Sequence, residues 1–375
     1  MDEFWQEEGK ALKGVIVARI RRGGPITFRD YMEMCLYHPR YGYYNAPRPP
    51  MGPGGDYLTS PEVSPIFGVL VGRQIYQMWE VMGSPHPFQV VEVGGGKGSL
   101  ARALLEWARA YRRPFFRALQ YVVVEKSPFL RFWARRLVSA SGLGRKVFFR
   151  KALPSQVVGC VVTNEVLDSF PVHRVLREGG KLREIYVGWG GSSFREELGP
   201  PSTPEIEAYF ARLGLWPGEG CYAEVNLEAV SFIREVGKAL ARGFVVTIDY
   251  GYEAHELYAP WRKDGTLMCF YGHRPSPSPY LRPGAQDMTS HVDFTTLIKV
   301  GAEVGLETLG LISQAQFLAN LGLYEAYRYP GLDLEEMLSR RRAVTELSDP
   351  AGLGRIGVLL QGKGVGQVRL LGLGG

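Results

Sequence analysis

The sequence has few cysteines, and they are widely separated. Four occur in 375 residues, and no two of them form a Cys-x-x-Cys pair: Cys35, Cys160, Cys221 and Cys269. The six histidines show no His-x-His or His-Glu-x-x-His spacing. Zinc sites and disulfide frameworks depend on such close, repeated spacings. The sequence therefore predicts neither a metal site nor a disulfide-stabilised fold.

Long apolar segments and a basic leader are also missing. No hydrophobic run approaches the roughly 18 to 20 residues that a membrane-spanning helix needs. The first residues are acidic and then mixed, without the basic start and apolar core of a secretory signal, and they are too acidic for a typical mitochondrial transit peptide. We therefore expect a cytoplasmic protein with no membrane span.

Several catalytic motifs are absent. The chain has no Gly-x-x-x-x-Gly-Lys-Ser/Thr phosphate loop and no Gly-x-Ser-x-Gly nucleophile elbow, which argues against P-loop nucleotide hydrolysis and against α/β-hydrolase chemistry. Asn164 is followed by Glu-Val-Leu. It is not followed by the Pro-Pro-aromatic sequence of enzymes that methylate DNA bases, which argues against DNA as a substrate.

The net charge is +6, and arginines cluster in three helix-like segments. A basic protein can bind nucleic acid. Arginines on helices more often form a solvated face with their aliphatic stems packed below. We therefore expect solvated faces at these clusters and no nucleic-acid partner. The clusters are Arg19, Arg21 and Arg22; Arg131, Arg135 and Arg136; and Arg340, Arg341 and Arg342.

Apolar, β-branched runs recur through the middle of the chain and predict buried strands at 88–93, 121–125, 160–163 and 244–249. Continuous apolar runs suit strands that helices cover on both faces, as in a parallel sheet. Segments 99–113 and 128–141 carry apolar residues at helical spacing. The alternation predicts an α/β fold with a doubly wound sheet. Two last strands are expected at 355–360 and 368–371.

Two interruptions break this alternation. Residues 171–190 alternate apolar and polar side chains around two glycines, which predicts a β-hairpin, and a helix is expected at 205–213. Residues 252–286 hold four prolines and predict a long irregular loop. We therefore divide the chain into a capping segment over the ligand cleft (1–87), a Rossmann-like core (88–170 and 241–375) and an inserted substrate-side subdomain (171–240).

The strongest functional signal is a glycine-rich turn after the first predicted strand of the core. Gly94, Gly96 and Gly98 occupy alternate positions just before a predicted helix. Glycine lets the chain turn sharply and lets a ligand lie against bare backbone. Dinucleotide-binding folds use Gly-x-Gly-x-x-Gly instead, and the third small position of that motif is Ser99 here.

Two carboxylates discriminate between cofactors. Glu92 lies two residues before the first glycine, where it would repel a pyrophosphate but attract the ammonium and sulfonium of S-adenosylmethionine. Glu125 ends the next predicted strand, where an acid can accept both ribose hydroxyls, a feature that NAD-binding folds share. Together the two acids favour S-adenosylmethionine as the cofactor.

Polar residues also follow two later strands. Asn164 and Glu165 come after the third predicted strand, and Asp249 ends the fourth. Ligands of open α/β sheets bind outside the carboxyl ends of the strands. A single residue of this kind can merely cap a helix, as Asn164 could. The whole group favours one shared cleft.

These residues resemble the MidA-like class I methyltransferases, a family that includes the mitochondrial complex I assembly methyltransferase. The resemblance covers nearly the whole chain and implies a seven-stranded sheet with insertions around the fourth and fifth strands. It also implies dimethylation of an arginine on a complex I subunit as a candidate activity. Gly95 and Lys97 replace the proline and arginine typical of the family, and lysine keeps the charge. The resemblance rests on blocks 28–44, 55–64, 94–98, 125–128, 163–172, 248–252, 290–294 and 314–321.

The strand-tip positions and the resemblance together suggest residue roles. The expected reaction is methylation of a protein side chain, with arginine favoured and a respiratory-complex subunit as a candidate partner. An arginine stays cationic in water, so carboxylates must orient it. Two alternatives remain open: a small-molecule methyltransferase, and a non-catalytic assembly factor that binds the cofactor. The catalytic candidates are Asn164, Glu165 and Asp249. The cofactor candidates beyond the glycine turn, Glu92 and Glu125 are Lys126, Thr59, Ser60, Glu62 and Asn164.

Overall fold

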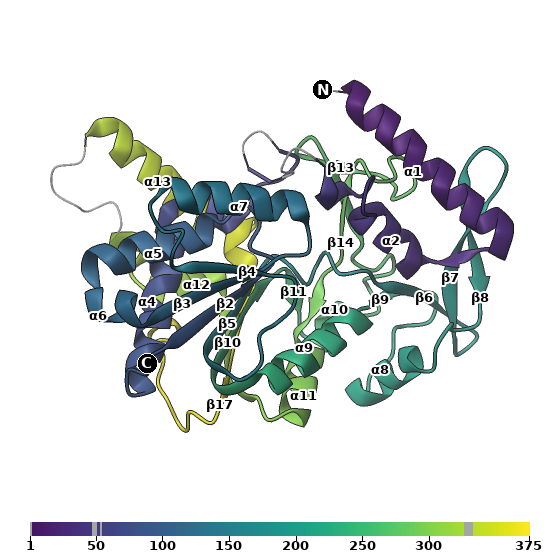
Figure 1. Ribbon diagram of the computed structural model, residues 1–375. Helices are drawn as coiled ribbons and strands as arrows, with labels where there is room; N and C mark the ends of the chain where they lie inside the picture. The colour runs from purple at the N-terminus through teal and green to yellow at the C-terminus, as the bar shows by residue number, and fades with distance from the viewer. Residues whose placement is uncertain (1, 47–50, 53–54, 326–332) are drawn as a thin grey trace.

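A computed structural model describes residues 2–46, 51–52, 55–325 and 333–375. Its centre is a seven-stranded sheet with the order β16-β17-β10-β5-β2-β3-β4 (Figure 1). Six strands run in the same direction, and only β17 runs the opposite way, antiparallel to its neighbours β10 and β16. This arrangement confirms the predicted seven-stranded α/β sheet. The strands are β2 (Phe88–Val93), β3 (Leu119–Val124), β4 (Val147–Arg150), β5 (Val157–Asn164), β10 (Leu240–Asp249), β16 (Glu307–Ser313) and β17 (Gly357–Lys363).

The central strands lie between two hydrophobic cores, because successive side chains of a strand point to opposite faces. In β2, Val90 packs with residues of α4 (Pro65–Val81) and α5 (Ser99–Tyr111), whereas Val91 packs with residues of α9 (Leu227–Ala239) and α11 (Phe294–Glu303). Burial on both faces explains why these strands are continuous apolar runs in the sequence. The helices predicted at 99–113 and 128–141 are α5 and α7 (Pro128–Ala140).

A smaller antiparallel sheet follows β5 in the chain. It contains β6 (His173–Glu178), β7 (Lys181–Trp189), β8 (Phe194–Gly199) and β9 (Tyr222–Val225), and β1 (Ile26–Thr27) pairs with β7. The predicted hairpin is β6–β7, and the predicted helix is α8 (Glu205–Leu213). Helices α1 (Asp2–Gly23) and α2 (Phe28–Tyr37) lie on this side of the molecule (Figure 1), and Phe28 and Tyr31 share a core with Val187. None of the described helices combines the length and apolar character needed to cross a bilayer.

Two sequence predictions are wrong. Residues 252–286 contain α10 (Ala254–Leu257), β12 (Met268–Tyr271) and β13 (Arg274–Ser276), and these strands form a small sheet with β14 (Asp287–Thr289). Pro275 fits there because β13 is an edge strand. Residues 368–371 are not a strand. The Gln77 side chain bonds the backbone of Arg369 and Leu371 instead of a neighbouring strand.

Candidate active site

The glycine-rich turn joins β2 to α5 through backbone that glycine adopts most easily. Gly94, Gly96 and Gly98 have φ angles of +71°, +51° and +85°, which lie in the left-handed region. A Cβ atom on Gly94 would lie 2.4 Å from Val166, so this glycine also permits a close approach by the segment after β5. The backbone of Gly94 and Gly96 lines a cavity of about 320 Å³, here called the cofactor chamber.

Glu125 follows β3 and lines the cofactor chamber together with Lys126. Its Oε2 accepts a hydrogen bond from the Gly96 N–H at 3.3 Å, and its Oε1 accepts one from the Ser127 N–H at 2.9 Å. Burial raises the pKa of Glu125, and these backbone hydrogen bonds lower it. A carboxylate anchored beside the glycine turn suits the paired hydroxyls of a ribose. The position of Glu125 beside the glycine turn therefore fits the sugar of S-adenosylmethionine.

The N-terminal segment contributes part of the wall of the cofactor chamber through Tyr37, Tyr44 and Tyr57. Two hydrogen bonds attach it to the core. The Tyr37 hydroxyl donates to the Ser169 carbonyl at 3.0 Å, and the Ser127 hydroxyl donates to the Tyr44 carbonyl at 2.7 Å. Part of the predicted capping segment thus lies directly against the cofactor chamber.

Glu92 is not among the side chains that line the cofactor chamber. It is buried, only 4% exposed, and its Oε2 accepts a hydrogen bond from the Tyr121 hydroxyl at 2.9 Å. Burial raises the pKa of Glu92 to about 8. A Cβ on Gly95 would come within 3.6 Å of the Glu92 carboxyl, so the carboxyl lies directly behind the glycine turn. Its predicted contact with the cofactor ammonium stays a prediction.

The segment 59–62 supports the site from outside the chamber wall. Glu62 pairs with Lys97 and accepts a hydrogen bond from the Ser99 hydroxyl, so it holds the end of the glycine turn that leads into α5. The Thr59 carbonyl accepts the Glu62 N–H, and Ser60 is fully buried. None of Thr59, Ser60 and Glu62 lines the cofactor chamber, and their contact with the cofactor also stays a prediction.

A second chamber of about 250 Å³ adjoins the first, and we call it the acceptor chamber. Tyr44, Tyr57 and Glu165 line both cavities, so they form the wall that the two share. The remaining lining comes from segments far apart in the sequence: Leu58, Asp168, Tyr250, Met268, Phe270, Asp287, Thr289, His291 and Arg355.

Glu165 occupies this shared wall with strained backbone. Its φ angle is +53°, a conformation that costs a non-glycine residue roughly 1 to 2 kcal/mol and that clusters at functional sites. Its Oε1 accepts hydrogen bonds from the Ser60 N–H at 2.9 Å and from Asn164 Nδ2 at 3.0 Å. Burial raises the pKa of Glu165 to about 7. Asn164 therefore orients Glu165 and lines neither chamber.

Asp249 lies behind the chambers. It is fully buried, and its Oδ2 accepts the backbone N–H groups of Val166 and Leu167 at 3.0 and 2.8 Å, while its Oδ1 accepts that of Tyr250 at 2.9 Å. It lines neither cavity. The structure thus gives Asp249 a positioning role for the segment that follows Glu165, and its predicted catalytic role stays a prediction.

Asp168 and Asp287 make the inner part of the acceptor chamber acidic. Asp287 accepts a hydrogen bond from the Tyr44 hydroxyl at 2.8 Å, and burial raises its pKa to about 7. Burial also raises the pKa of Asp168, and the charges of Asp249, Asp287 and Glu165 raise it further. Asp168 stands in a block that the sequence singles out. Asp287 carries no sequence signal, because only the fold brings the start of β14 to this wall.

His291 and Arg355 line the same chamber, and their side chains approach each other at 3.5 Å. Burial and the nearby Arg355 lower the pKa of His291 to about 4, so its ring is neutral near pH 7. The chamber therefore holds three acids and one exposed guanidinium. Within the described ranges, no group of three or more His, Cys, Asp or Glu side chains could hold a metal ion.

Comparison with known proteins assigns this site to a class. A profile of S-adenosyl-L-methionine-dependent methyltransferases matches residues 70–312. A Burkholderia thailandensis protein crystallised with S-adenosyl-homocysteine has 33% identity and a TM-score of 0.89, with 99% of this chain and 96% of that chain covered. The chain belongs to this methyltransferase family, and its cofactor is S-adenosylmethionine.

Individual relatives carry more specific names. A Drosophila melanogaster protein named protein arginine methyltransferase NDUFAF7 homolog, mitochondrial, is 30% identical over 90% of this chain and 81% of its own length. The human protein arginine methyltransferase NDUFAF7, mitochondrial, is 27% identical over 82% of this chain and 72% of its own length. The MidA-like resemblance found in the sequence is thereby confirmed.

Proposed function

We propose that this methyltransferase modifies an arginine side chain of a protein. The observation that carries the proposal is the acceptor chamber, which shares Glu165 with the cofactor chamber and adds Asp168 and Asp287. The names of the arginine methyltransferases to which the chain is similar support the same substrate class. A respiratory-complex subunit as the acceptor protein stays a prediction.

The charge of the acceptor chamber favours a cationic substrate group. Asp168 is 7% exposed, and no cationic side chain of the described residues forms an ion pair with it, with Asp287 or with Glu165. Buried carboxylates without cationic partners are costly, and the cost grows when they lie near one another. A guanidinium has five N–H donors in a planar fork and matches carboxylates in pairs. Its arrival would supply the cationic partner that no ion pair among the described residues gives these three carboxylates.

Glu165 is placed to act on the reacting nitrogen. S-adenosylmethionine supplies the methyl group when it is bound in the adjoining chamber. Glu165 can hold one guanidinium nitrogen through its Oε2 and accept the proton that this nitrogen loses, while Ser60 and Asn164 fix its Oε1. Tyr44 and Tyr57 form part of the wall between the two chambers and limit entry of water.

The test compares protein methylation in cells with and without this gene by mass spectrometry. The proposal predicts arginines that carry one or two additional methyl groups only when the gene is present, and none when the gene encodes Glu165→Gln. Gene-dependent methylation confined to a small molecule would instead identify a small-molecule methyltransferase. No gene-dependent methylation, together with intact cofactor binding, would support the assembly-factor alternative.

A further inference from the structure

The positive charge of this protein comes from one segment of the chain. Residues 107–164 contain twelve Lys or Arg and a single acid, Glu125, which is buried. The rest of the chain has 32 basic and 37 acidic residues, so it is net negative. Charge segregation on this scale creates a surface potential that attracts anionic partners over about a Debye length.

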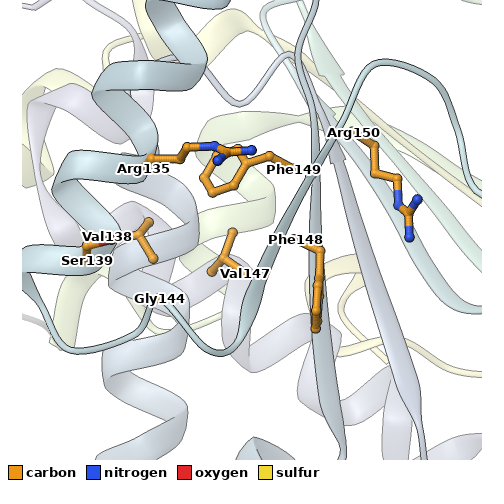
Figure 2. A pocket seen from close by; sticks show the side chains of 8 residues that line it. All are labelled: Arg135, Val138, Ser139, Gly144, Val147, Phe148, Phe149 and Arg150. Atoms are coloured by element: carbon orange, nitrogen blue, oxygen red, sulfur yellow. The ribbon is translucent and has the colours of Figure 1, made fainter.

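The fold brings most of this segment to one side of the molecule, and we call that surface the basic face. Contacts join its elements. Arg109 of α5 donates to the Ser141 carbonyl after α7 at 3.2 Å, and Lys146 before β4 donates to the Arg117 carbonyl of α6 (Arg113–Ala118) at 3.0 Å. In Figure 1 these helices and β4 occupy the side of the molecule away from α1 and α8. Arg150 points to the other side of β4 from Arg135 (Figure 2), so the basic face consists of the other eleven cations: Arg109, Arg112, Arg113, Arg117, Lys126, Arg131, Arg135, Arg136, Arg145, Lys146 and Lys151.

The cations of the basic face are not neutralised within the protein. None of the eleven forms an ion pair with a carboxylate of the described residues, whereas arginines elsewhere, such as Arg174 and Arg212, do. Several stack on aromatic rings instead. Figure 2 shows Arg135 reaching over Phe149, with 4.9 Å between the guanidinium carbon and the ring centroid. The two side chains line a hollow of about 380 Å³ between α7 and β4.

Large apolar side chains are exposed among these cations. On α7, Phe132 is 55% exposed and Phe129, three residues before it, is 38% exposed, whereas the exposed Phe148 of β4 points away from α7 (Figure 2). Phenylalanine has no polar atom that water can satisfy, so each exposed ring favours transfer to a less polar environment. Arginines interspersed with exposed phenylalanines are characteristic of protein surfaces that lie in the headgroup region of an anionic membrane.

We propose that the basic face docks this protein on an anionic phospholipid surface. The unneutralised arginines would bind lipid phosphates, each contributing about 1 kcal/mol near the surface, and Phe129 and Phe132 would enter the headgroup boundary. A single nucleic-acid strand is bound in a groove with successive stacking platforms, whereas Phe129 and Phe132 are exposed on one helix, α7. Lys126 and Lys151 also line the cofactor chamber, so docking would bring its mouth close to the membrane.

Cosedimentation with lipid vesicles tests this proposal. The full-length protein should sediment with vesicles of phosphatidylcholine mixed with phosphatidylglycerol, and not with pure phosphatidylcholine. Binding should disappear in 1 M salt, where the Debye length falls to about 3 Å. The double variant Arg135→Glu with Arg136→Glu should weaken binding more than about tenfold. Phe132→Ser should weaken binding at low salt, where the parent protein binds.

The matched control is Arg341→Glu with Arg342→Glu on α13 (Leu334–Ser348), which makes the same charge change on two exposed arginines outside the basic face. It should leave vesicle binding within about twofold of the parent. Unchanged affinity for S-adenosylmethionine would show that each variant is folded. The proposal would be overturned if the two double variants lost vesicle binding equally, or if the parent protein failed to bind anionic vesicles. Binding to oligouridylate in place of vesicles would also overturn it. These readouts do not depend on methyl transfer.

Discussion

The backbone N–H of Ser60 donates a hydrogen bond to Glu165 Oε1 at 2.9 Å. This bond joins residues 105 positions apart and ties the N-terminal segment to the residue that both chambers share. It leaves Oε2 of the same carboxylate as the oxygen available to a substrate. The site is thus assembled from a strand tip of the sheet and a segment that precedes the sheet in the chain.

Glu165→Gln should separate cofactor binding from catalysis. The amide keeps the size of the side chain and can still accept from Ser60, but it cannot take a proton from the acceptor. Methyl transfer should fall by at least about 100-fold, while the dissociation constant for S-adenosylmethionine changes less than about threefold. Calorimetry and a single-turnover transfer assay measure the two quantities. Transfer at the parent rate would remove Glu165 from the catalytic machinery.

Asp168→Asn should weaken acceptor binding more than it slows the chemical step. Loss of one charged hydrogen bond to a guanidinium costs about 1.5 to 3 kcal/mol, which corresponds to a KM for an arginine peptide that is roughly 10- to 150-fold higher. Asp264→Asn, a change at an exposed acid outside both chambers, is the matched control and should leave KM unchanged. An equal KM for the two variants would argue against Asp168 as a guanidinium ligand.

Methyl transfer to an arginine peptide should become less efficient as the pH falls below 7. Burial raises the pKa of Glu165 and of Asp287 to about 7, so both are largely protonated at pH 6 and ionised at pH 8. The guanidinium stays charged across this range and needs ionised partners. We expect kcat/KM for an arginine peptide to rise from pH 6 to pH 8, and to rise less steeply in Asp287→Asn. A flat profile between pH 6 and 8 would contradict this assignment.

Buried acids should make the protein less stable as pH rises. Glu92 has a folded-state pKa of about 8, above its ordinary value, so the folded state holds a proton that the unfolded chain has lost. The stabilisation is fully present below the ordinary pKa and is lost as pH rises toward 8. Denaturant unfolding should show this decline from about pH 5 to pH 8. Glu92→Gln, which can still accept from Tyr121, should reduce its slope, and an unchanged slope would assign the decline to other groups.

Gly94→Ala and Gly96→Ala should lower the affinity for the cofactor to different extents. Both place a side chain on left-handed backbone, at roughly 1 to 2 kcal/mol each. A Cβ on Gly94 would also meet Val166 at 2.4 Å, whereas one on Gly96 would find Met51 at 3.7 Å. Cofactor affinity should therefore drop further in Gly94→Ala, and Val166→Ala should restore part of it. Identical affinities for the two glycine variants would show that the contact with Val166 is unimportant.

Much of the fold could be predicted because it depends on local patterns. Central strands such as β2 and β5 are apolar runs buried on both faces, and the glycine turn needs residues that tolerate positive φ. The edge strands β4 and β16 went unpredicted because the apolar run of β4 is only three residues long and that of β16 is interrupted by Gly310. Residues 368–371 look like a strand, yet the Gln77 side chain binds their backbone, which no local pattern reveals.

The site was predicted in part. Gly94, Gly96, Glu125, Lys126 and Glu165 line the chambers, since strand tips of an α/β sheet converge at its carboxyl edge. Glu92, Glu62 and Asp249 lie behind this lining because buried hydrogen bonds hold them there, and burial is a tertiary property. Asp287 and Arg355 reach the acceptor chamber through long-range folding, so their sequence neighbours carry no sign of it.

The most direct measurement uses an extract of cells that lack this gene. The purified protein transfers an isotopically labelled methyl group from S-adenosylmethionine to proteins of the extract, and the labelled amino acid is then identified. The account predicts that the purified protein places label on arginine and that Glu165→Gln does not. Label on another amino acid, or equal arginine labelling by both proteins, would contradict the assignment of the acidic chamber to a guanidinium.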